Sequence, residues 1–307
     1  MTPDLRVELC GLSLPTPLVL AAGILGTGAG LLERVARTGA GAVTCKSCSL
    51  RPRRGHPNPT VVPFEGGLLN AVGLANPGAE AMVPELLQTR KRCVPLGVKV
   101  IASVFGETVE EFGRVVEILE AAEPDLYEVN ISCPNVAEEF GRPFAADPLQ
   151  AARATAAVRA ATGRPIVVKL SPNVPDICAV GRAVVEAGAD ALTAINTLGP
   201  GMMIDIRARA SVLANRTGGV SGPAIRPVAV RCVYDLARAV PVPIIGMGGV
   251  RSGEDAVEMI MAGATAVGVG SAFHELGMDA LAAIGREMLE FMTQEGYGTV
   301  AAMRGLA

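Results

Sequence analysis

The chain has 307 residues, a length that suits a single α/β barrel domain. Half of its residues are apolar, only 3% are aromatic and none is Trp, so a large core must be built from aliphatic side chains. The formal net charge is −3 at pH 7 and no basic cluster is interleaved with aromatic residues, which argues against nucleic-acid binding.

The mean hydropathy of +0.40 raises the question of a membrane segment, and the stretch 12–32 carries no charge. That stretch contains Pro15, Pro17 and four glycines, which are costly in a spanning helix, so we predict a buried strand and a loop. The first residues lack a basic region followed by an apolar run. We therefore expect no signal peptide, no membrane association and a cytoplasmic location.

The seven cysteines are odd in number and scattered through apolar surroundings, a pattern typical of reduced thiols. Cys45 and Cys48 form one C-x-x-C motif. A structural zinc site usually needs a second pair, and a redox pair needs a thioredoxin-like context. The sequence offers neither, so we expect no metal site and no disulfide in this chain.

Short runs rich in Val, Ile and Leu alternate with amphipathic stretches along the chain, which is typical of βαβ units around a parallel sheet. Eight runs are candidate strands: 18–22, 42–45, 97–103, 126–130, 166–170, 191–195, 244–247 and 266–269. Eight helices are expected after them, at 30–37, 78–90, 107–121, 147–161, 176–187, 224–239, 252–262 and 279–294. Eight such units predict an α/β fold of the (β/α)8 TIM-barrel type, with residues 1–307 as a single domain.

Two features lie outside this repeat. The runs 6–9 and 12–14, split by Gly11, predict a hairpin that closes one end of the barrel. A loose G-x-G-x-x-G pattern around Gly28 favours a doubly wound sheet instead, but no suitable acidic residue follows about 20 positions later. The eight units favour the barrel.

Three connections exceed the usual ~2–6 residues: 47–77, 133–146 and 198–222. All three leave the carboxyl ends of strands, where barrel enzymes build their active sites. We therefore expect elaborated loops at this face.

Polar residues at strand ends support that expectation. Lys46, Asn130, Lys169 and the pair Asn196-Thr197 all lie at or near predicted carboxyl ends. Two lysines in this position predict an anionic ligand, because burying an unpaired ammonium is costly. The alternative for either lysine alone is a side chain that reaches solvent or pairs with a core carboxylate.

Glycine-rich segments follow the last two predicted strands, at Gly248-Gly249 and Gly270-Ser271. Bare backbone N–H groups at these loops form the usual phosphate site of a barrel. Tight turning alone explains one such loop. Both together, beside the lysines, indicate a phosphorylated cofactor or substrate.

Cys133 lies in the loop after the fourth predicted strand. From its position it is a nucleophile, a general base, a metal ligand or inert. The two histidines, His56 and His274, form no convincing dyad with it. A proton-transferring cysteine beside a flavin fits better than a hydrolase.

The chain resembles the class 1 dihydroorotate dehydrogenases over nearly its whole length, and most closely the class 1B catalytic subunit. The segments that carry the resemblance are Asn70-Ala71-Val72-Gly73-Leu74, Asn76-Pro77-Gly78, Asn130-Ile131-Ser132-Cys133-Pro134-Asn135, Lys169-Leu170-Ser171-Pro172-Asn173, Ile195-Asn196-Thr197-Leu198, Gly218-Gly219-Val220-Ser221-Gly222-Pro223-Ala224-Ile225 and Gly246-Met247-Gly248-Gly249-Val250. Their joint order and spacing make the match specific.

The resemblance implies a TIM barrel with one FMN per chain that oxidises (S)-dihydroorotate to orotate in de novo pyrimidine synthesis. It implies that Cys133 is the base that removes the C5 proton while hydride passes from C6 to flavin N5. The implied substrate residues are Lys46, Asn70, Ala71, Val72, Gly73, Leu74, Asn130, Asn196 and Thr197. The implied FMN residues are Ala22, Lys46, Ser47, Ser103, Asn130, Lys169, Ile195, Gly222, Gly248, Gly249, Gly270 and Ser271, with Lys169 near the N1–O2 edge.

The chain departs from the family pattern at two FMN positions. Ala22 replaces a serine that is common in the family and offers only backbone, and Ser103 replaces a common asparagine with a shorter-reaching hydroxyl. We interpret both as tuning of flavin affinity.

Cys133, where the quinone-linked class 2 enzymes have Ser, and the lack of a membrane-binding extension argue against class 2. Asn196-Thr197-Leu198 resembles class 1B, which implies that electrons reach NAD through a partner subunit carrying FAD and a [2Fe–2S] cluster. A homodimer, or a heterotetramer with that subunit, follows from the same resemblance. Three alternatives stay open: a fumarate-linked class 1A enzyme, a related flavoprotein for another dihydropyrimidine, and a non-catalytic barrel that binds phosphate ligands.

Overall fold

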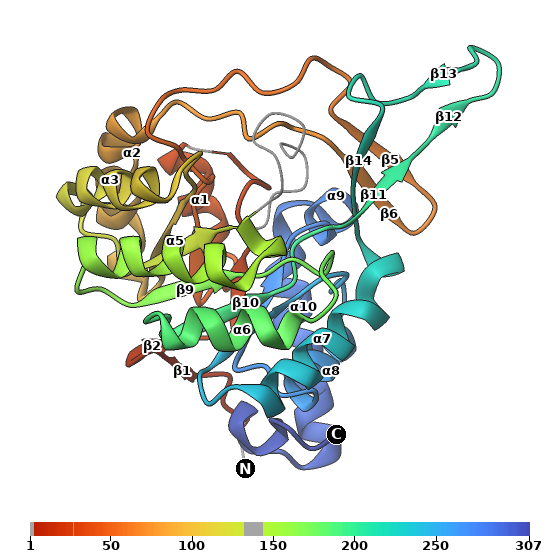
Figure 1. The fold of residues 1–307 in the computed structure, drawn as a ribbon. Helices are drawn as coiled ribbons and strands as arrows, with labels where there is room; N and C mark the ends of the chain where they lie inside the picture. The colour runs from red at the N-terminus through yellow and green to blue at the C-terminus, as the bar shows by residue number, and fades with distance from the viewer. Residues whose placement is uncertain (1–2, 27, 132–143) are drawn as a thin grey trace.

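The computed structural model describes residues 3–26, 28–131 and 144–307 (Figure 1). Eight parallel strands close into a barrel, and they follow one another around it in chain order. These strands are β3 (Leu18–Leu20), β4 (Ala42–Thr44), β7 (Lys99–Val104), β8 (Leu126–Asn130), β9 (Ile166–Lys169), β10 (Ala191–Ala194), β15 (Ile244–Met247) and β16 (Ala266–Val269). Each overlaps one of the eight predicted strands, so the predicted (β/α)8 barrel is confirmed.

Helices surround the barrel on its outside (Figure 1). They are α1 (Ala29–Ala36), α2 (Ala79–Cys93), α3 (Val109–Leu119), α5 (Pro148–Ala161), α6 (Ile177–Glu186), α7 (Arg226–Ala239), α8 (Gly253–Met261), the short α9 (Ala272–Leu276) and α10 (Ala280–Glu295). Single 3-10 turns are η1 (Val94–Leu96), η2 (Glu120–Ala122), η4 (Phe144–Ala146), η5 (Pro223–Ile225), η6 (Gly277–Asp279) and η7 (Val300–Met303). The eight predicted helices are all present, and α9 is the one further α-helix among the described residues.

Side chains cap the starts of two helices, α5 and α8. Asp147 accepts a hydrogen bond from the backbone N–H of Leu149, with Pro148 in the first turn. Ser252 and Asp255 form a capping box at the start of α8, each side chain accepting from the other's backbone N–H. These caps satisfy N–H groups that a helix leaves without internal partners.

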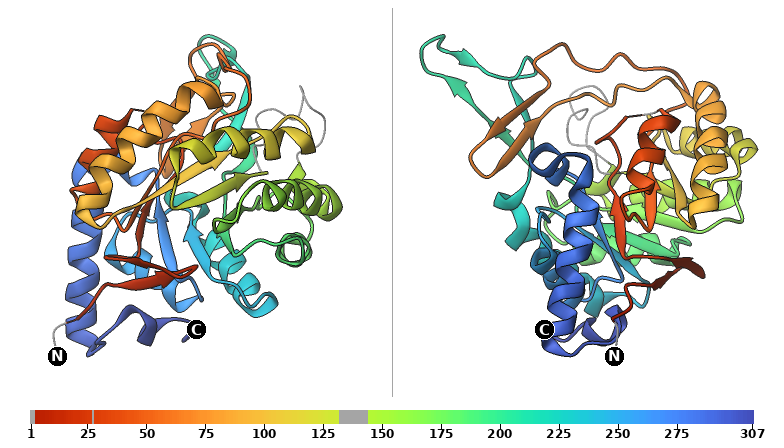
Figure 2. Two further views of the ribbon diagram at one scale, coloured as in Figure 1. Left: turned by 90° about the vertical axis from the view of Figure 1, so that its left-hand side faces the viewer. Right: turned by 180° about the vertical axis from the view of Figure 1, so that it is seen from behind.

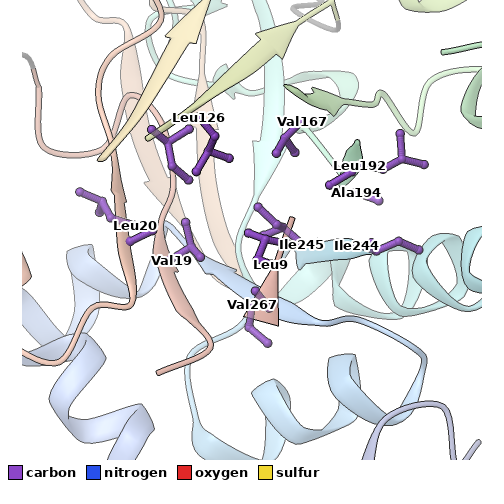
Figure 3. Packing of buried hydrophobic residues seen from close by; sticks show 14 of the residues in the cluster. Leu9, Val19, Leu20, Leu126, Val167, Leu192, Ala194, Ile244, Ile245 and Val267 are labelled. Atoms are coloured by element: carbon purple, nitrogen blue, oxygen red, sulfur yellow. The ribbon is translucent and has the colours of Figure 1, made fainter. Parts of the chain in front are cut away.

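The barrel core is aliphatic, as the composition required. Val19, Leu20, Val167 and Ile245 are at most 1% exposed and pack in one buried cluster (Figure 3). Parallel strands covered by helices read as continuous apolar runs because both of their faces are buried.

A hairpin of β1 (Val7–Leu9) and β2 (Leu12–Leu14) covers the amino end of the barrel, as predicted. Leu9 is fully buried and lies beside Ile245 and Val267 (Figure 3). The thiol of Cys10 donates to the backbone oxygen of Asp190, just before β10, over 3.6 Å. The two ends of the chain lie at this same end of the molecule (Figure 2).

A second sheet lies at the opposite end, where sequence analysis predicted only loops. It has four antiparallel strands in the order β11-β14-β6-β5. They are β5 (Val61–Phe64), β6 (Gly67–Asn70), β11 (Leu198–Met202) and β14 (Thr217–Ser221). A hairpin of β12 (Ile204–Asp205) and β13 (Ala210–Ser211) projects beyond it (Figures 1 and 2). The connections after β4 and β10 thus fold together into one structure.

Among the described residues, the helices are all too short or too polar to cross a bilayer.

Candidate active site

A cavity of about 420 Å³ opens at the carboxyl ends of the barrel strands, beneath the second sheet. This volume lies within the ~300–1,000 Å³ typical of small-molecule sites. Its walls come from the ends of barrel strands and from β5, β6 and β14. The site therefore lies where the long connections predicted it, because carboxyl ends of parallel strands converge at one face of a barrel.

Most of the residues singled out from the sequence meet in this cavity. Those that line it are Ala22, Lys46, Ser47, Asn70, Val72, Gly73, Leu74, Asn130, Lys169, Ile195, Asn196, Thr197, Gly222, Gly248, Gly249, Gly270 and Ser271. Ala71 is instead 1% exposed in a small core with Leu69 and Leu213, outside the cavity lining. Ser103 is fully buried below the cavity. Cys133 lies outside the described residues.

A hydrogen-bonded chain of side chains forms the floor of the cavity. Asn130 Nδ2 donates to Ser47 Oγ over 3.2 Å, and the hydroxyls of Ser47 and Ser103 are 2.8 Å apart. Ser103 Oγ donates to Glu128 Oε1 over 3.2 Å. Because each hydroxyl has one proton, Ser103 uses its own on Glu128 and must accept from Ser47. The sequence placed Ser103 against the cofactor; the structure shows it one layer lower.

Lys169, the last residue of β9, also reaches Glu128. Its ammonium lies 3.9 Å from Glu128 Oε1, and both side chains are buried. Lys169 therefore pairs with a core carboxylate, the alternative raised from the sequence, and it also lines the cavity. Sequence analysis did not single out Glu128, although an acidic residue inside an apolar strand was a usable signal.

The polar residues after β10 are held by their neighbours. Asn196 Nδ2 lies 3.5 Å from Asn130 Oδ1, and Asn196 Oδ1 accepts from the backbone N–H of Thr197 over 2.8 Å. Asn173 Nδ2 donates to the Thr197 backbone oxygen over 3.1 Å. The amides of Asn130 and Asn196 are thus fixed by contacts at the cavity floor and rim.

The segment from Asn70 to Leu74 enters the cavity from the second sheet. Asn70 Nδ2 donates to the Gly219 backbone oxygen over 3.2 Å. The loop before the sheet supports the next residues: His56 Nδ1 lies 3.1 Å from Ala71 O, and the His56 backbone N–H donates to Val72 O over 3.1 Å. His56 therefore holds the backbone of Ala71 and Val72 in place.

Two glycine loops form one wall of the cavity. Gly248 has a φ of +134°, and a Cβ placed on it would lie 2.7 Å from the Cβ of Ala229 in α7. Any other residue would be strained and would collide with the helix. At the other loop, a Cβ on Gly270 would lie 3.4 Å from the side chains of Ala21 and Ile24. Both glycines line the cavity, and bare glycine backbone is the kind of surface that can bind a phosphate.

The C-x-x-C pair lies beneath the site and carries free thiols. Cys45 and Cys48 are fully buried and unlinked. Burial raises the pKa of the Cys45 thiol to about 12 and the pKa of Cys48 well above its usual value. Thiols with raised pKa hold little thiolate at neutral pH and are poor nucleophiles.

The structure also adds lining residues that sequence analysis missed. They include Ile24, Leu25, Val61, Leu68, Ser221, Ile225, Met247, Phe273 and His274. Ser221 and Met247 adjoin predicted glycines, so their motifs contained the signal. Val61 and Leu68 had none, because only the pairing of β5 with β6 and of β6 with β14 brings them to the cavity.

Residues 4–292 match the family model described as dihydroorotate dehydrogenase. The chain is 47% identical over 99% of its length to the "Dihydroorotate dehydrogenase B (NAD(+)), catalytic subunit" of Methanothermobacter thermautotrophicus, covering 98% of that protein. Proteins with the same name from Methanosarcina mazei (47% identity, 99% of this chain and 95% of that one) and Pyrococcus horikoshii (41%, 99% and 97%) are also similar. The chain therefore belongs to the dihydroorotate dehydrogenase family, in the class 1B that its motifs resemble.

Proposed function

We propose that this protein, with residues 1–307 as a single FMN-binding domain, oxidises (S)-dihydroorotate to orotate in de novo pyrimidine synthesis. The observation that carries the proposal is one cavity where Lys46, Lys169, the asparagines and both glycine loops meet, in a chain of this family. The electrons would pass to NAD through a partner subunit that holds FAD and a [2Fe–2S] cluster.

The residues present fit one FMN. Ile195 and Met247 supply apolar wall, Lys169 places a cation on the floor, and the glycine loops at Gly248 and Gly270 leave bare backbone for a phosphate. The residues that would hold the cofactor are Ala22, Lys46, Ser47, Asn130, Lys169, Ile195, Gly222, Gly248, Gly249, Gly270 and Ser271. Ser103 would support the cofactor site indirectly, through its hydrogen bond with Ser47. Bound FMN would supply the hydride acceptor.

The substrate ring suits the other side of the cavity. Dihydroorotate carries a carboxylate and ring N–H and C=O groups, and Asn70, Asn130 and Asn196 each offer both a donor and an acceptor. Lys46 offers a cation to the carboxylate. The fixed amides of Asn130 and Asn196 would orient the ring before reaction, since preorganised contacts reduce the entropic cost of alignment.

The proton at C5 needs a base, and we assign this role to Cys133 on the family resemblance. Cys133 lies outside the described residues, but it is three positions after Asn130, which lines the cavity. Three residues span at most ~11 Å, so the position of Cys133 in the sequence is compatible with this role. The chain on either side of residues 132–143 is joined at the barrel rim, where the Ala145 backbone N–H donates to Ile131 O over 3.1 Å.

The proposal of a partner subunit is supported by the relatives, which are named catalytic subunits of NAD(+)-linked enzymes. A homodimer of this chain, alone or as the core of a heterotetramer, fits the same naming. A fumarate-linked enzyme is the alternative for the electron acceptor, and another dihydropyrimidine is the alternative substrate.

The test is spectroscopic. The purified chain should show a flavin spectrum, and anaerobic dihydroorotate should bleach it; a colourless chain that takes up no added FMN would refute the proposal. Bleaching by dihydrouracil alone would favour the alternative substrate. Turnover with fumarate, and with NAD with and without the partner, would then identify the acceptor.

A matched pair of variants sharpens the test. Lys46→Met removes a cation from the cavity, whereas Lys91→Met removes one from the exposed face of α2. Only the first should weaken orotate binding. Equal orotate affinity in both variants would remove Lys46 from the substrate site.

A further inference from the structure

Glu128 is a buried carboxylate to which the proposed function gives no role. It lies in the middle of β8, is 2% exposed and does not line the cavity. Among the described residues, the buried charged side chains are Glu128, Lys169 and Asp255, and Asp255 belongs to the cap of α8. Glu128 and Lys169 are therefore an isolated pair of opposite charges inside the barrel.

Two hydroxyls and one ammonium surround the carboxyl group of Glu128. Ser103 Oγ donates to Oε1 over 3.2 Å, and Thr193 Oγ1 donates to Oε2 over 3.4 Å. Each carboxyl oxygen of Glu128 therefore has one hydroxyl partner. The ammonium of Lys169 at 3.9 Å adds the compensating charge that a buried carboxylate needs.

The strand register places this pair directly under the cofactor region. Glu128 is two residues before Asn130 on β8, and Asn130 pairs with Lys169 across to β9. Asn130 and Lys169 both line the cavity, so Lys169 connects the buried carboxylate with whatever occupies it.

We propose that Glu128 is a positioning residue that sets the reduction potential of the bound FMN by holding Lys169 and offsetting part of its positive charge. This inference rests on the proposed function, in which Lys169 meets the flavin N1–O2 edge. Positive charge near that edge favours the reduced, more negative cofactor, and a carboxylate behind the lysine weakens the effect. The pair would keep the potential low enough for electrons to leave readily.

The test measures the midpoint potential of the FMN-loaded protein at pH 7 by anaerobic titration against a reference dye. Glu128→Gln keeps the size and polarity of the side chain but removes its charge. It should raise the potential and favour reduced over oxidised FMN by at least tenfold, which is about 30 mV for a two-electron couple. An unchanged or lowered potential would overturn the proposal.

Two further variants separate charge from structure. Thr193→Val removes a hydrogen bond to Glu128 without changing the charge. Its ratio of reduced to oxidised FMN should stay within threefold of the ratio in the parent protein. Glu128→Asp restores the charge and should return the potential toward the parent value. If Thr193→Val shifts the potential as much as Glu128→Gln does, the effect is structural and the proposal fails.

A second pair of variants, built on Lys169→Met, covers the case in which Glu128→Gln does not fold. Lys169→Met should lower the midpoint potential. Adding Glu128→Gln to Lys169→Met should raise it again, so that the ratio of reduced to oxidised FMN increases at least threefold. Equal potentials in these two proteins would overturn the role of Glu128. Failure of the parent chain to bind FMN would refute the proposed function instead, so the two failures are distinguishable.

Discussion

The side-chain amide of Asn70 donates to the backbone oxygen of Gly219 over 3.2 Å and joins two segments that lie 149 residues apart. The two residues are also paired in the register of β6 and β14. A Cβ on Gly219 would lie 2.1 Å from Thr197 Oγ1, so glycine is needed for Thr197 to reach the cavity. One contact point thus organises residues from both insertions that we propose to bind the substrate.

Replacing Asn70 tests this arrangement. Asn70→Ala removes the contact to Gly219 and one proposed contact to the substrate, each worth about 1 kcal/mol. We expect KM for dihydroorotate to rise at least tenfold while FMN stays bound. Asn215→Ala is the control, because Asn215 Nδ2 donates to Thr217 O over 3.1 Å in the same insertion but does not line the cavity. Equal KM values in the two variants would argue against the role of Asn70.

Gly248 offers a test of the proposed contact between the glycine loops and the FMN phosphate. Gly248→Ala would place a methyl group 2.7 Å from Ala229 at a positive φ, so the loop must shift away from α7. We expect FMN affinity to fall at least tenfold, as measured by flavin fluorescence. Gly39→Ala is the control for backbone strain, because Gly39 also has a positive φ but has nothing within 4 Å of the added Cβ. It should lose about 1 kcal/mol of stability and keep its FMN affinity.

Cys133→Ala should leave FMN bound and slow its reduction by dihydroorotate at least ~10²-fold, the scale for losing a general base. Stopped-flow absorbance under anaerobic conditions measures this rate. Because a free thiol titrates near pH ~8.5, the rate of the parent protein should rise as pH increases toward that value. Cys232→Ala, a loss of thiol from α7 outside the cavity lining, should reduce at the parent rate. Near-parent reduction of Cys133→Ala would exclude the base role.

The buried thiol of Cys45 predicts a loss of stability at alkaline pH. Burial raises its pKa from 9.0 to about 12, so the folded state keeps a proton that the unfolded state releases. The stabilisation is therefore complete below pH 9 and disappears as pH rises from about 9 to about 12. Each pH unit in this window should remove about 1.4 kcal/mol of unfolding free energy.

Chemical denaturation at pH 8, 9.5 and 10.5 measures this slope. Cys45→Ala should make it shallower by about one proton's contribution. Val43→Ala truncates a neighbouring buried side chain that does not titrate, so it should lower the unfolding free energy equally at every pH. Parallel curves for the parent and Cys45→Ala would contradict the raised pKa.

The barrel and much of its site could be predicted from the sequence because their signals are local. Each barrel strand is a short apolar run, and polar residues such as Lys46 and Lys169 mark the carboxyl ends of strands. In a closed parallel barrel those ends meet at one face, so the topology alone brings such residues together. The hairpin over the amino end was readable for the same reason, from two short runs around Gly11.

Only the tertiary structure determined the second sheet and the depth of individual side chains. The strands β6 and β14 pair with each other although they come from two distant insertions, so the local sequence of neither strand shows this pairing. Ser103 and Ala71 lie in segments that the sequence identified correctly, but whether each side chain reaches the cavity depends on strand direction and packing. The pairing of Glu128 with Lys169 depends on the register between β8 and β9, which is a property of the closed barrel rather than of either strand.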